Sequence, residues 1–264
     1  MTKLQKIRIG SFVMYLLSDT VNPSQFLDKF LRTGNQANKG RGGLKLISIN
    51  DELFVCRKYL HGGVGRAVTK DLFLSEKRAL NEIQIMLYLK ENHFPVVEPV
   101  GILIGEDFPF RKPHIITRFE DNTGELLEFI KVSSRKKRLR AIRDLARYMW
   151  HLERLGIFHP DLHLRNVLVK KNGRLIFLDF DKASKRTISK KNVEAMIWRL
   201  NRFAEKWEIK GYFRISILER LLFIRTYSKL SGYNLEEEMA KKLVTKKLLS
   251  RAGWFAESIL YGKN

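Results

Sequence analysis

The sequence has 264 residues, of which 44% are hydrophobic and 30% are charged. That hydrophobic content excludes a disordered chain, and the length is sufficient for one two-lobed domain or two small ones. Fifty Lys and Arg against 28 Asp and Glu give a formal net charge of +22, an excess that requires an anionic partner. Nucleic acid, anionic lipid and a phosphorylated glycolipid all meet that requirement, and the charge alone does not distinguish them.

The N-terminal residues contain an uncharged run, Ile9 to Ser18, which is too short to cross a bilayer and is followed by Asp19. Basic residues precede this run, as in a signal peptide, but no small-residue cleavage pattern follows it. We therefore expect a β-strand at residues 12–16 and a protein that remains in the cytoplasm. The single cysteine, Cys56, cannot form an intramolecular disulfide, which fits a reducing compartment.

A glycine cluster precedes two β-like runs, residues 44–49 and 53–59. Glycines allow a backbone to approach phosphates closely, and N–H groups there can cradle them. The cluster matches neither the G-x-x-x-x-G-K-[ST] loop nor a full G-x-G-x-x-G, so an ordinary turn is an alternative. The candidate nucleotide-binding glycines are Gly40, Gly42 and Gly43.

A cation on the second β-like run would bind the nucleotide phosphates, and Arg57 and Lys58 both qualify. Strand alternation directs these two side chains to opposite faces. Arg57 shares its face with Val55 and Tyr59, so we favour Arg57 and keep Lys58 as the alternative.

Residues 75–91 have the apolar periodicity of a helix. Glu82 lies inside the apolar stripe, where a carboxylate is costly unless it meets a cation. We expect Glu82 to form an ion pair with Arg57 or Lys58. The alternative is a solvated residue on the flank of the helix.

Farther along, a second apolar stripe predicts a helix over residues 134–155 that ends at Gly156 and leads into the sequence HPDLHLRN at residues 159–166. Asp179 follows Asn166 by thirteen residues. This places an acid, an amide and a second acid at the spacing of a phosphoryl-transfer loop and its metal-binding strand end. Asp161 would deprotonate an attacking hydroxyl.

Asn166 and Asp179 would hold Mg²⁺ on the nucleotide phosphates, since hard cations prefer oxygen ligands. Residues 167–169 and 174–178 read as a hairpin around Asn172-Gly173, which would return Asp179 to a place beside Asn166. The alternative is that these acids and amides are solvated loop residues.

In chain order, these motifs resemble those of the lipopolysaccharide core kinases, and within that family the kinases of 3-deoxy-D-manno-octulosonic acid (Kdo). The resemblance covers about residues 35–185, and its most specific parts are the R-x-Y-x-x-G-G run and the D-F-D ending. It implies an α+β, two-lobed, protein-kinase-like fold. A small β-rich nucleotide-binding lobe would occupy residues 1–118, and a larger, mainly helical catalytic and acceptor-binding lobe residues 119–264.

The resemblance also implies ATP-dependent transfer of phosphate to the 4-hydroxyl of Kdo, with ATP and Mg²⁺ as cofactors and Asp161 as the active-site aspartate. The acceptor would be Kdo-lipid A or a related acidic glycolipid. We expect the enzyme to be peripheral on the anionic cytoplasmic side of the inner membrane, held there by basic clusters such as residues 135–140. Only about ten residues separate Asp181 from the next helical pattern, which leaves no room for the activation segment of a protein kinase.

Two alternatives stay open. One keeps the kinase and changes its acceptor to heptose, a protein or a small cationic antibiotic, of which the antibiotic is disfavoured because a charge of +22 repels cations. The other is an inactive basic module that binds nucleic acid or lipid. The intact Asp161, Asn166 and Asp179 argue against an inactive module, and the absence of a recognised nucleic-acid motif argues against nucleic acid as the partner.

Overall fold

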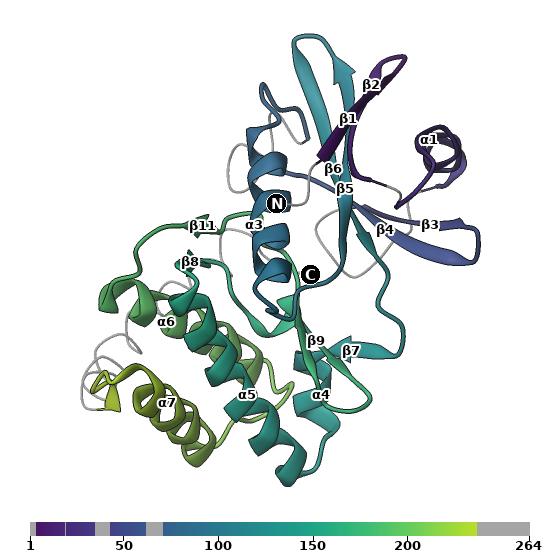
Figure 1. The fold of residues 1–264 in the computed structure, drawn as a ribbon. Helices are drawn as coiled ribbons and strands as arrows, with labels where there is room; N and C mark the ends of the chain where they lie inside the picture. The colour runs from purple at the N-terminus through teal and green to yellow at the C-terminus, as the bar shows by residue number, and fades with distance from the viewer. Residues whose placement is uncertain (1–3, 19, 35–42, 62–70, 237–264) are drawn as a thin grey trace. The chain divides into compact units, whose positions relative to one another are not determined.

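The computed structural model describes residues 4–18, 20–34, 43–61 and 71–236. The chain divides into two compact units, and each is described by itself. Unit 1 comprises Met1–Thr123 and Ile176–Ser184, and unit 2 comprises Gly124–Leu175 and Lys185–Asn264. Unit 1 is rich in β-sheet and unit 2 is mainly helical, so the predicted α+β fold class is confirmed (Figure 1). Within the described residues, no helix is long and apolar enough to span a bilayer.

Unit 1 is built on a six-stranded antiparallel sheet with the strand order β1-β2-β5-β6-β4-β3. Strands β2, β3 and β4 fall on the runs that the sequence predicts as strands. The six strands are β1 (Leu4–Ile9), β2 (Phe12–Leu17), β3 (Leu44–Ile49), β4 (Glu52–Lys58), β5 (Pro99–Asp107) and β6 (Phe110–Arg118).

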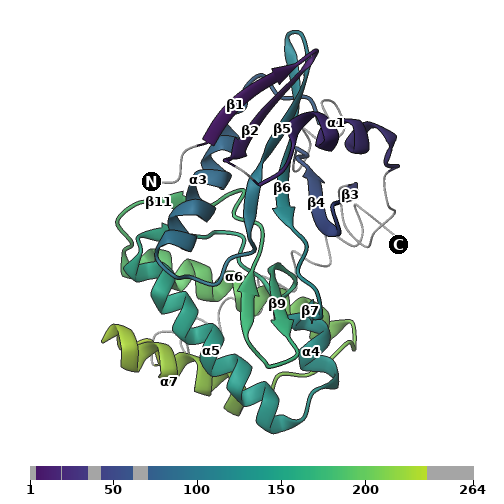
Figure 2. The ribbon, with the colours of Figure 1, turned by 45° about the vertical axis from the view of Figure 1, so that its right-hand side comes forward.

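Two helices cover opposite faces of this sheet (Figure 2). Helix α1 (Pro23–Arg32) begins at Asn22, whose side chain caps the helix by accepting a hydrogen bond from the Gln25 N–H at 3.0 Å. Its apolar side buries Phe26 and Phe30 in the main core of unit 1. Helix α3 (Lys77–Glu91), on the other face, packs on β5 and β6.

Strand β4 separates its side chains between these two faces. Cys56 is fully buried in the core formed with α1. Arg57 points to α3, where its Nη2 lies 2.8 Å from Glu82 Oε1. Lys58 lies on the opposite side of the strand and pairs with Asp71. The predicted alternation of Arg57 and Lys58 between opposite faces of the strand is therefore confirmed, and Arg57 is the residue that pairs with Glu82.

Segment Ile176–Ser184 belongs to unit 1 although it follows residues of unit 2 in the sequence. The Phe177 N–H donates to the Pro95 carbonyl at 2.7 Å, and the Phe180 N–H donates to Glu82 Oε1 at 3.1 Å. The Phe180 side chain is fully buried. Glu82 thus joins three parts of unit 1, namely α3, β4 and this later segment.

The described helices of unit 2 follow the apolar periodicity of the sequence. Helix α5 ends where predicted, before Gly156, whose φ of +70° suits a residue without a side chain. Helices α6 and α7 begin with capping boxes at Ser189 and Ser216. The described α-helices of this unit are α4 (Leu126–Val132), α5 (Arg135–Arg154), α6 (Lys190–Ile209) and α7 (Ile217–Ser231).

Short elements precede α4 or lie between α5 and α6 in the sequence. The predicted hairpin is present, with its turn closed by the Gly173 N–H donating to the Lys170 carbonyl at 2.8 Å. Residues 235–261, which the sequence also predicts as helical, lie mostly outside the described residues. The short elements are β7 (Thr123–Glu125), β8 (Ile157–Phe158), η1 (Leu164–Asn166), β9 (Val167–Lys170), β10 (Leu175–Phe177) and β11 (Ser184–Lys185).

We predict that Glu82→Ala loosens unit 1, because it leaves Arg57 partly buried without its partner and removes the acceptor of the Phe180 N–H. The loss should be on the order of 3–5 kcal/mol in the free energy of unfolding. Cys56, the only cysteine, is fully buried in unit 1, so the rate at which its thiol reacts with a disulfide reagent reports the opening of this unit. We expect Glu82→Ala to raise that rate by about a hundredfold or more.

The matched control is Lys90→Ala on the same helix, which removes the ion pair of Lys90 with Glu98, whose side chains are 48% and 35% exposed. Exposed pairs contribute little, so labelling should change by less than about fivefold. Equal labelling rates in the two variants would show that Glu82 does not hold unit 1 together.

Candidate functional site

The part of the candidate site in unit 1 is centred on Glu82, whose side chain is 1% exposed. Arg57 Nη2 donates to both carboxylate oxygens, at 2.8 and 3.0 Å, and the Tyr59 hydroxyl also donates to this carboxylate. Burial raises the pKa of Glu82 from 4.5 to about 7, against the opposing effect of Arg57, and the nearby Asp179 adds to the rise. The folded chain therefore binds the proton of the Glu82 carboxyl group more tightly than the unfolded chain does. Protonated Glu82 adds to the free energy of unfolding at a pH below its ordinary pKa of 4.5, and this contribution is lost as the pH rises toward about 7.

Asp179 is the exposed acid of the D-F-D sequence, with 39% of its side chain accessible to solvent. Its Oδ1 lies 3.3 Å from Arg57 Nη2. The backbone has a φ of +59°, which is uncommon outside glycine but which Asp and Asn tolerate. This conformation places an exposed carboxylate directly before the buried Phe180.

Asp181, two residues later, has a structural environment. Both of its oxygens accept hydrogen bonds from the Arg78 guanidinium of α3, and its side chain is 11% exposed. The Asn81 side-chain amide, also on α3, donates to the Ala183 carbonyl at 3.0 Å. These contacts hold the segment around Asp179 to the helix that carries Glu82.

The cation beside Asp179 is Arg57. Burial acts to lower the pKa of Arg57, but Glu82 and Asp179 more than offset it, so the net pKa is raised and the guanidinium stays charged. Its neighbour Lys58 is engaged with Asp71 on the other face of β4. The geometry therefore favours Arg57 over Lys58, while a role of either residue in phosphate binding stays a prediction.

Of the three candidate glycines, Gly40 and Gly42 lie outside the described residues. Gly43 immediately precedes β3 at the edge of the sheet in unit 1. Phosphate binding by this cluster stays a prediction.

The part of the candidate site in unit 2 is the loop of residues 159–166. Its first residue, His159, is fully buried, and its N–H donates to Met196 Sδ on α6 at 3.3 Å. At the other end, η1 turns the chain so that the Asn166 N–H donates to the His163 carbonyl at 2.9 Å and the Asn166 amide donates to the Asp161 carbonyl at 3.3 Å. The loop is thus shaped by α6 and by its own Asn166.

Asp161 has a partner that the sequence analysis did not identify, Arg199 of α6. Arg199 Nε lies 2.9 Å from Asp161 Oδ1, and Nη2 donates to the same oxygen. The two side chains are 30% and 37% exposed, so the pair is open to solvent. The sequence shows Arg199 only as one of several basic residues on an amphipathic helix, and nothing in its spacing points to Asp161.

The two residues predicted to bind Mg²⁺ through oxygen are Asn166, which belongs to unit 2, and Asp179, which belongs to unit 1. Among the described residues, there is no group of three or more His, Cys, Asp or Glu side chains that could hold a metal by itself. Mg²⁺ does not need such a group in nucleotide enzymes, because one or two carboxylates together with substrate phosphates and waters complete its octahedron. An amide oxygen and a carboxylate are donors of the kind that Mg²⁺ prefers, and binding of Mg²⁺ by Asn166 and Asp179 stays a prediction.

Comparison with known proteins identifies relatives of this chain. A 3-deoxy-D-manno-octulosonic acid kinase of Xanthomonas oryzae pv. oryzae (strain PXO99A) is 28% identical over 169 residues, which cover 62% of this chain and 66% of the relative. The protein of the same name from Xanthomonas axonopodis pv. citri (strain 306) is 29% identical over 169 residues, with the same coverage of each chain. That from Stenotrophomonas maltophilia (strain K279a) is 27% identical over 165 residues, which cover 61% of this chain and 62% of the relative.

The chain thus spans slightly less than two thirds of the length of these relatives. The sequence model of the lipopolysaccharide kinase (Kdo/WaaP) family matches residues 32–220. That range includes Arg57, Glu82, Asp161, Asn166 and Asp179, and also Arg199. The chain belongs to the lipopolysaccharide kinase (Kdo/WaaP) family.

Proposed function

We propose that this chain is an ATP-dependent kinase that phosphorylates the 4-hydroxyl of Kdo on Kdo-lipid A or a related acidic glycolipid. The family match and the names of the relatives support a kinase of lipopolysaccharide sugars. The observation that carries the proposal is the loop of residues 159–166, in which Asp161 is presented with Arg199 at its carboxylate and Asn166 at its carbonyl.

Each residue has a defined task in this proposal. Asp161 accepts the proton of the acceptor hydroxyl as that oxygen bonds to the terminal phosphorus of ATP, while the bond from this phosphorus to the bridging oxygen breaks and ADP leaves. Arg57, held by Glu82, binds nucleotide phosphates from unit 1. Asn166 and Asp179 are the protein ligands of Mg²⁺, which when bound neutralises the charge that develops on the phosphates.

Arg199 supports an acidic acceptor. A guanidinium forms paired hydrogen bonds with carboxylate or phosphate, and Arg199 is 37% exposed beside the proposed base. Kdo carries a carboxylate, so Arg199 can bind the acceptor while it fixes the orientation of Asp161. The excess of positive charge, +22, likewise favours an acidic glycolipid and the anionic cytoplasmic side of the inner membrane as the place where the enzyme works.

Incubation of the full chain with Kdo-lipid A, ATP and Mg²⁺ should yield a product that gains the mass of one phosphoryl group. An acceptor that lacks the Kdo 4-hydroxyl should gain none.

Asp161→Asn keeps the size of the side chain and its contact with Arg199 but removes the base, so it should lower the rate by about a hundredfold or more while ATP still binds. Mass spectrometry measures the rate of phosphoryl transfer, and nucleotide titration measures the binding of ATP. Phosphate on the analogue without the 4-hydroxyl would contradict the proposed position, and a variant with more than about a tenth of the normal rate would contradict the role of Asp161.

Asp179→Asn should raise the Mg²⁺ concentration needed for half-maximal transfer, because it removes a formal charge from the metal ligand. Asn also tolerates the left-handed backbone at this position, so the variant tests charge without straining the turn. Asp121→Asn is the matched control, since Asp121 is an exposed acid elsewhere in unit 1. If the unmodified protein, Asp179→Asn and Asp121→Asn all need the same Mg²⁺ concentration for half-maximal transfer, Asp179 is excluded as a ligand.

Arg199→Gln should raise the KM for the acidic acceptor and lower kcat, with little change in the KM for ATP. We expect a loss of about 10- to 100-fold in kcat/KM for the acceptor, with partial recovery in Arg199→Lys. Arg202→Gln, three residues along the same helix and exposed, controls for the loss of one positive charge. An equal effect of Arg202→Gln, or a change confined to the KM for ATP, would remove Arg199 from the acceptor site.

A further inference from the structure

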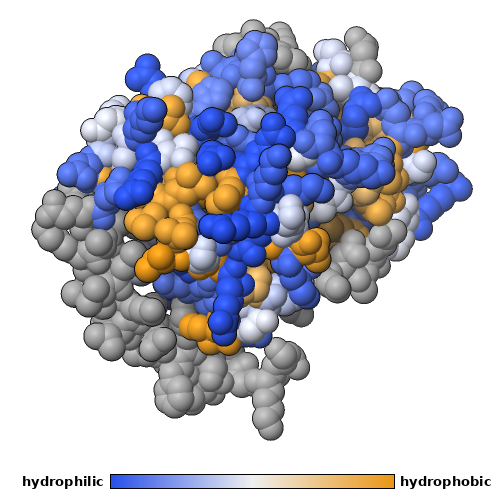
Figure 3. All heavy atoms as spheres, turned by 90° about the horizontal axis from the view of Figure 1, so that it is seen from below, coloured by the Kyte–Doolittle hydropathy of each residue, from blue (hydrophilic) through white to orange (hydrophobic). Residues whose placement is uncertain are grey.

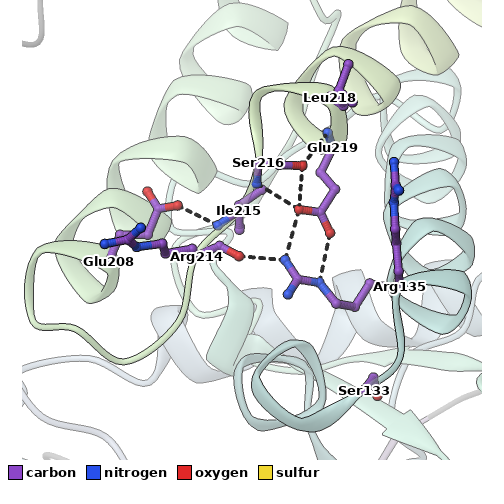
Figure 4. Close-up of a pocket in the computed structure, with 9 residues that line it drawn as sticks. Ser133, Arg135, Glu208, Arg214, Ile215, Ser216, Leu218 and Glu219 are labelled. Atoms are coloured by element: carbon purple, nitrogen blue, oxygen red, sulfur yellow. Dashed lines mark hydrogen bonds and ion pairs between the residues drawn. The ribbon is translucent and has the colours of Figure 1, made fainter.

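An open hollow of about 930 Å³ in unit 2 lies where three helix ends meet. Its lining includes Ser133 and Arg135 between α4 and the start of α5, Glu208 near the end of α6, and, before and in the first turn of α7, Arg214, Ile215, Ser216 and Leu218 (Figure 4). None of these residues belongs to the candidate site described above. The hollow and its rim are therefore a separate feature of unit 2.

Four large aliphatic side chains in or next to the lining segments are exposed, namely Val132, Ile209, Ile217 and Leu218, which are 78%, 61%, 74% and 60% accessible to solvent. Leu218 lines the hollow, and each of the other three adjoins a lining residue in the sequence. Single exposed aliphatic residues are ordinary, but a group of them on one face indicates an interaction surface. Figure 3 shows hydrophobic patches among hydrophilic side chains on the face turned to the viewer.

These aliphatic residues are presented by an ordered connection. The Arg138 guanidinium lies 2.8 Å from Glu219 Oε1 and also donates to the Arg214 carbonyl at 2.6 Å. Ser216 N–H donates to Glu219 Oε2 at 2.7 Å, and Glu208 accepts from the Ile215 N–H at 2.6 Å (Figure 4). The connection before α7 is thereby held so that Ile217 and Leu218 project outward.

The same contacts leave the surface positively charged. Glu219 is neutralised by Arg138 and Glu208 by Arg220, so both acids of the hollow are used internally. Within the described part of the chain, Arg135 and Arg214 make no salt bridge and are exposed. Lys136, Lys137 and Lys210 are also exposed beside them in the sequence. Arg138, by contrast, is 18% exposed and committed to Glu219, so it is a structural member of the basic cluster at residues 135–140.

We propose that this basic aliphatic face docks on an anionic lipid bilayer, with Val132, Ile209, Ile217 and Leu218 in the headgroup region and Arg135 and Arg214 on lipid phosphates. The proposal deepens the proposed function, on which it rests for the membrane as the place of the acceptor. Lysine and arginine around an exposed apolar group are the composition of interfacial membrane-binding surfaces.

Other partners fit this face less well. A second copy of the chain would carry the same charge of +22 and be repelled. Nucleic acid would match the charge, but single strands are bound by stacking on aromatic side chains, and the exposed residues here are aliphatic. An anionic bilayer satisfies the cations and the aliphatic side chains together.

The test is sedimentation of the full chain with vesicles of phosphatidylcholine alone or mixed with phosphatidylglycerol. The protein should bind the mixed vesicles and not the neutral ones, and the binding should weaken with salt as the Debye length falls from about 10 Å at 0.1 M to about 3 Å at 1 M. The double variant Ile217→Asn/Leu218→Asn keeps every charge, and it should bind mixed vesicles about tenfold more weakly with an unchanged thermal midpoint. Leu74→Asn is the matched control, because Leu74 is 75% exposed in unit 1, and it should bind normally.

Several outcomes would overturn the proposal. One is equal binding of the double variant and the unmodified protein, and another is an equal loss in Leu74→Asn. A third is binding to neutral vesicles alone. A fourth is that duplex DNA displaces the double variant and the unmodified protein from the vesicles equally well.

Transfer of phosphate to a soluble Kdo-containing fragment separates this proposal from the proposed function. The double variant should retain that transfer, whereas a protein that binds vesicles but phosphorylates no Kdo acceptor would refute the function and leave the docking face standing.

Discussion

The fold of unit 1 depends on the buried carboxylate of Glu82. A carboxylate that is 1% exposed is tolerated only when hydrogen-bond donors surround it, and here three donor residues come from two separate parts of the chain. Arg57 and Tyr59 come from the sheet side and Phe180 from a segment almost a hundred residues later. The same contact that satisfies Glu82 places Arg57 within 3.3 Å of Asp179. The contacts that stabilise the packing of unit 1 therefore also position Arg57 and Asp179, the residues proposed to bind ligands.

The arginines of this protein separate into those used internally and those turned outward. Arg57, Arg78 and Arg138 each meet a carboxylate of low exposure, and together they fix α3, the D-F-D segment and the start of α7. Arg199 is intermediate, because it holds Asp161 and is still open to an incoming acid. Such differences explain why the net charge alone gives little information about which residues meet an anionic partner. Only the burial of each side chain and the identity of its neighbour make the distinction.

The short D-F-D segment shows how three adjacent residues acquire different tasks. Phe180 is fully buried, which anchors the segment. Asp181 is held by Arg78, whereas Asp179 keeps 39% of its side chain in contact with solvent. Strand alternation alone would put both acids on the same side, because they are two residues apart. The left-handed φ of +59° at Asp179 interrupts the extended backbone, and Arg78 pairs with Asp181, so one acid is structural and the other is available to a ligand. The last residue of the D-F-D segment, Asp181, thus has a local ion pair with Arg78 as its partner.

The sequence by itself determined the order and type of most elements, because apolar periodicity, capping residues and an Asn-Gly turn act over short distances. It also identified Glu82 as a buried acid and Asp161, Asn166 and Asp179 as candidates, since their spacing is a local property. The tertiary structure alone decided that Arg57 and not Lys58 meets Glu82, that Arg199 meets Asp161, and that Arg138 is internal. It also decided that segment Ile176–Ser184 belongs to unit 1. These partners lie 25 to 81 residues apart in the sequence, and a long charged side chain has no periodicity that names a partner at such a distance.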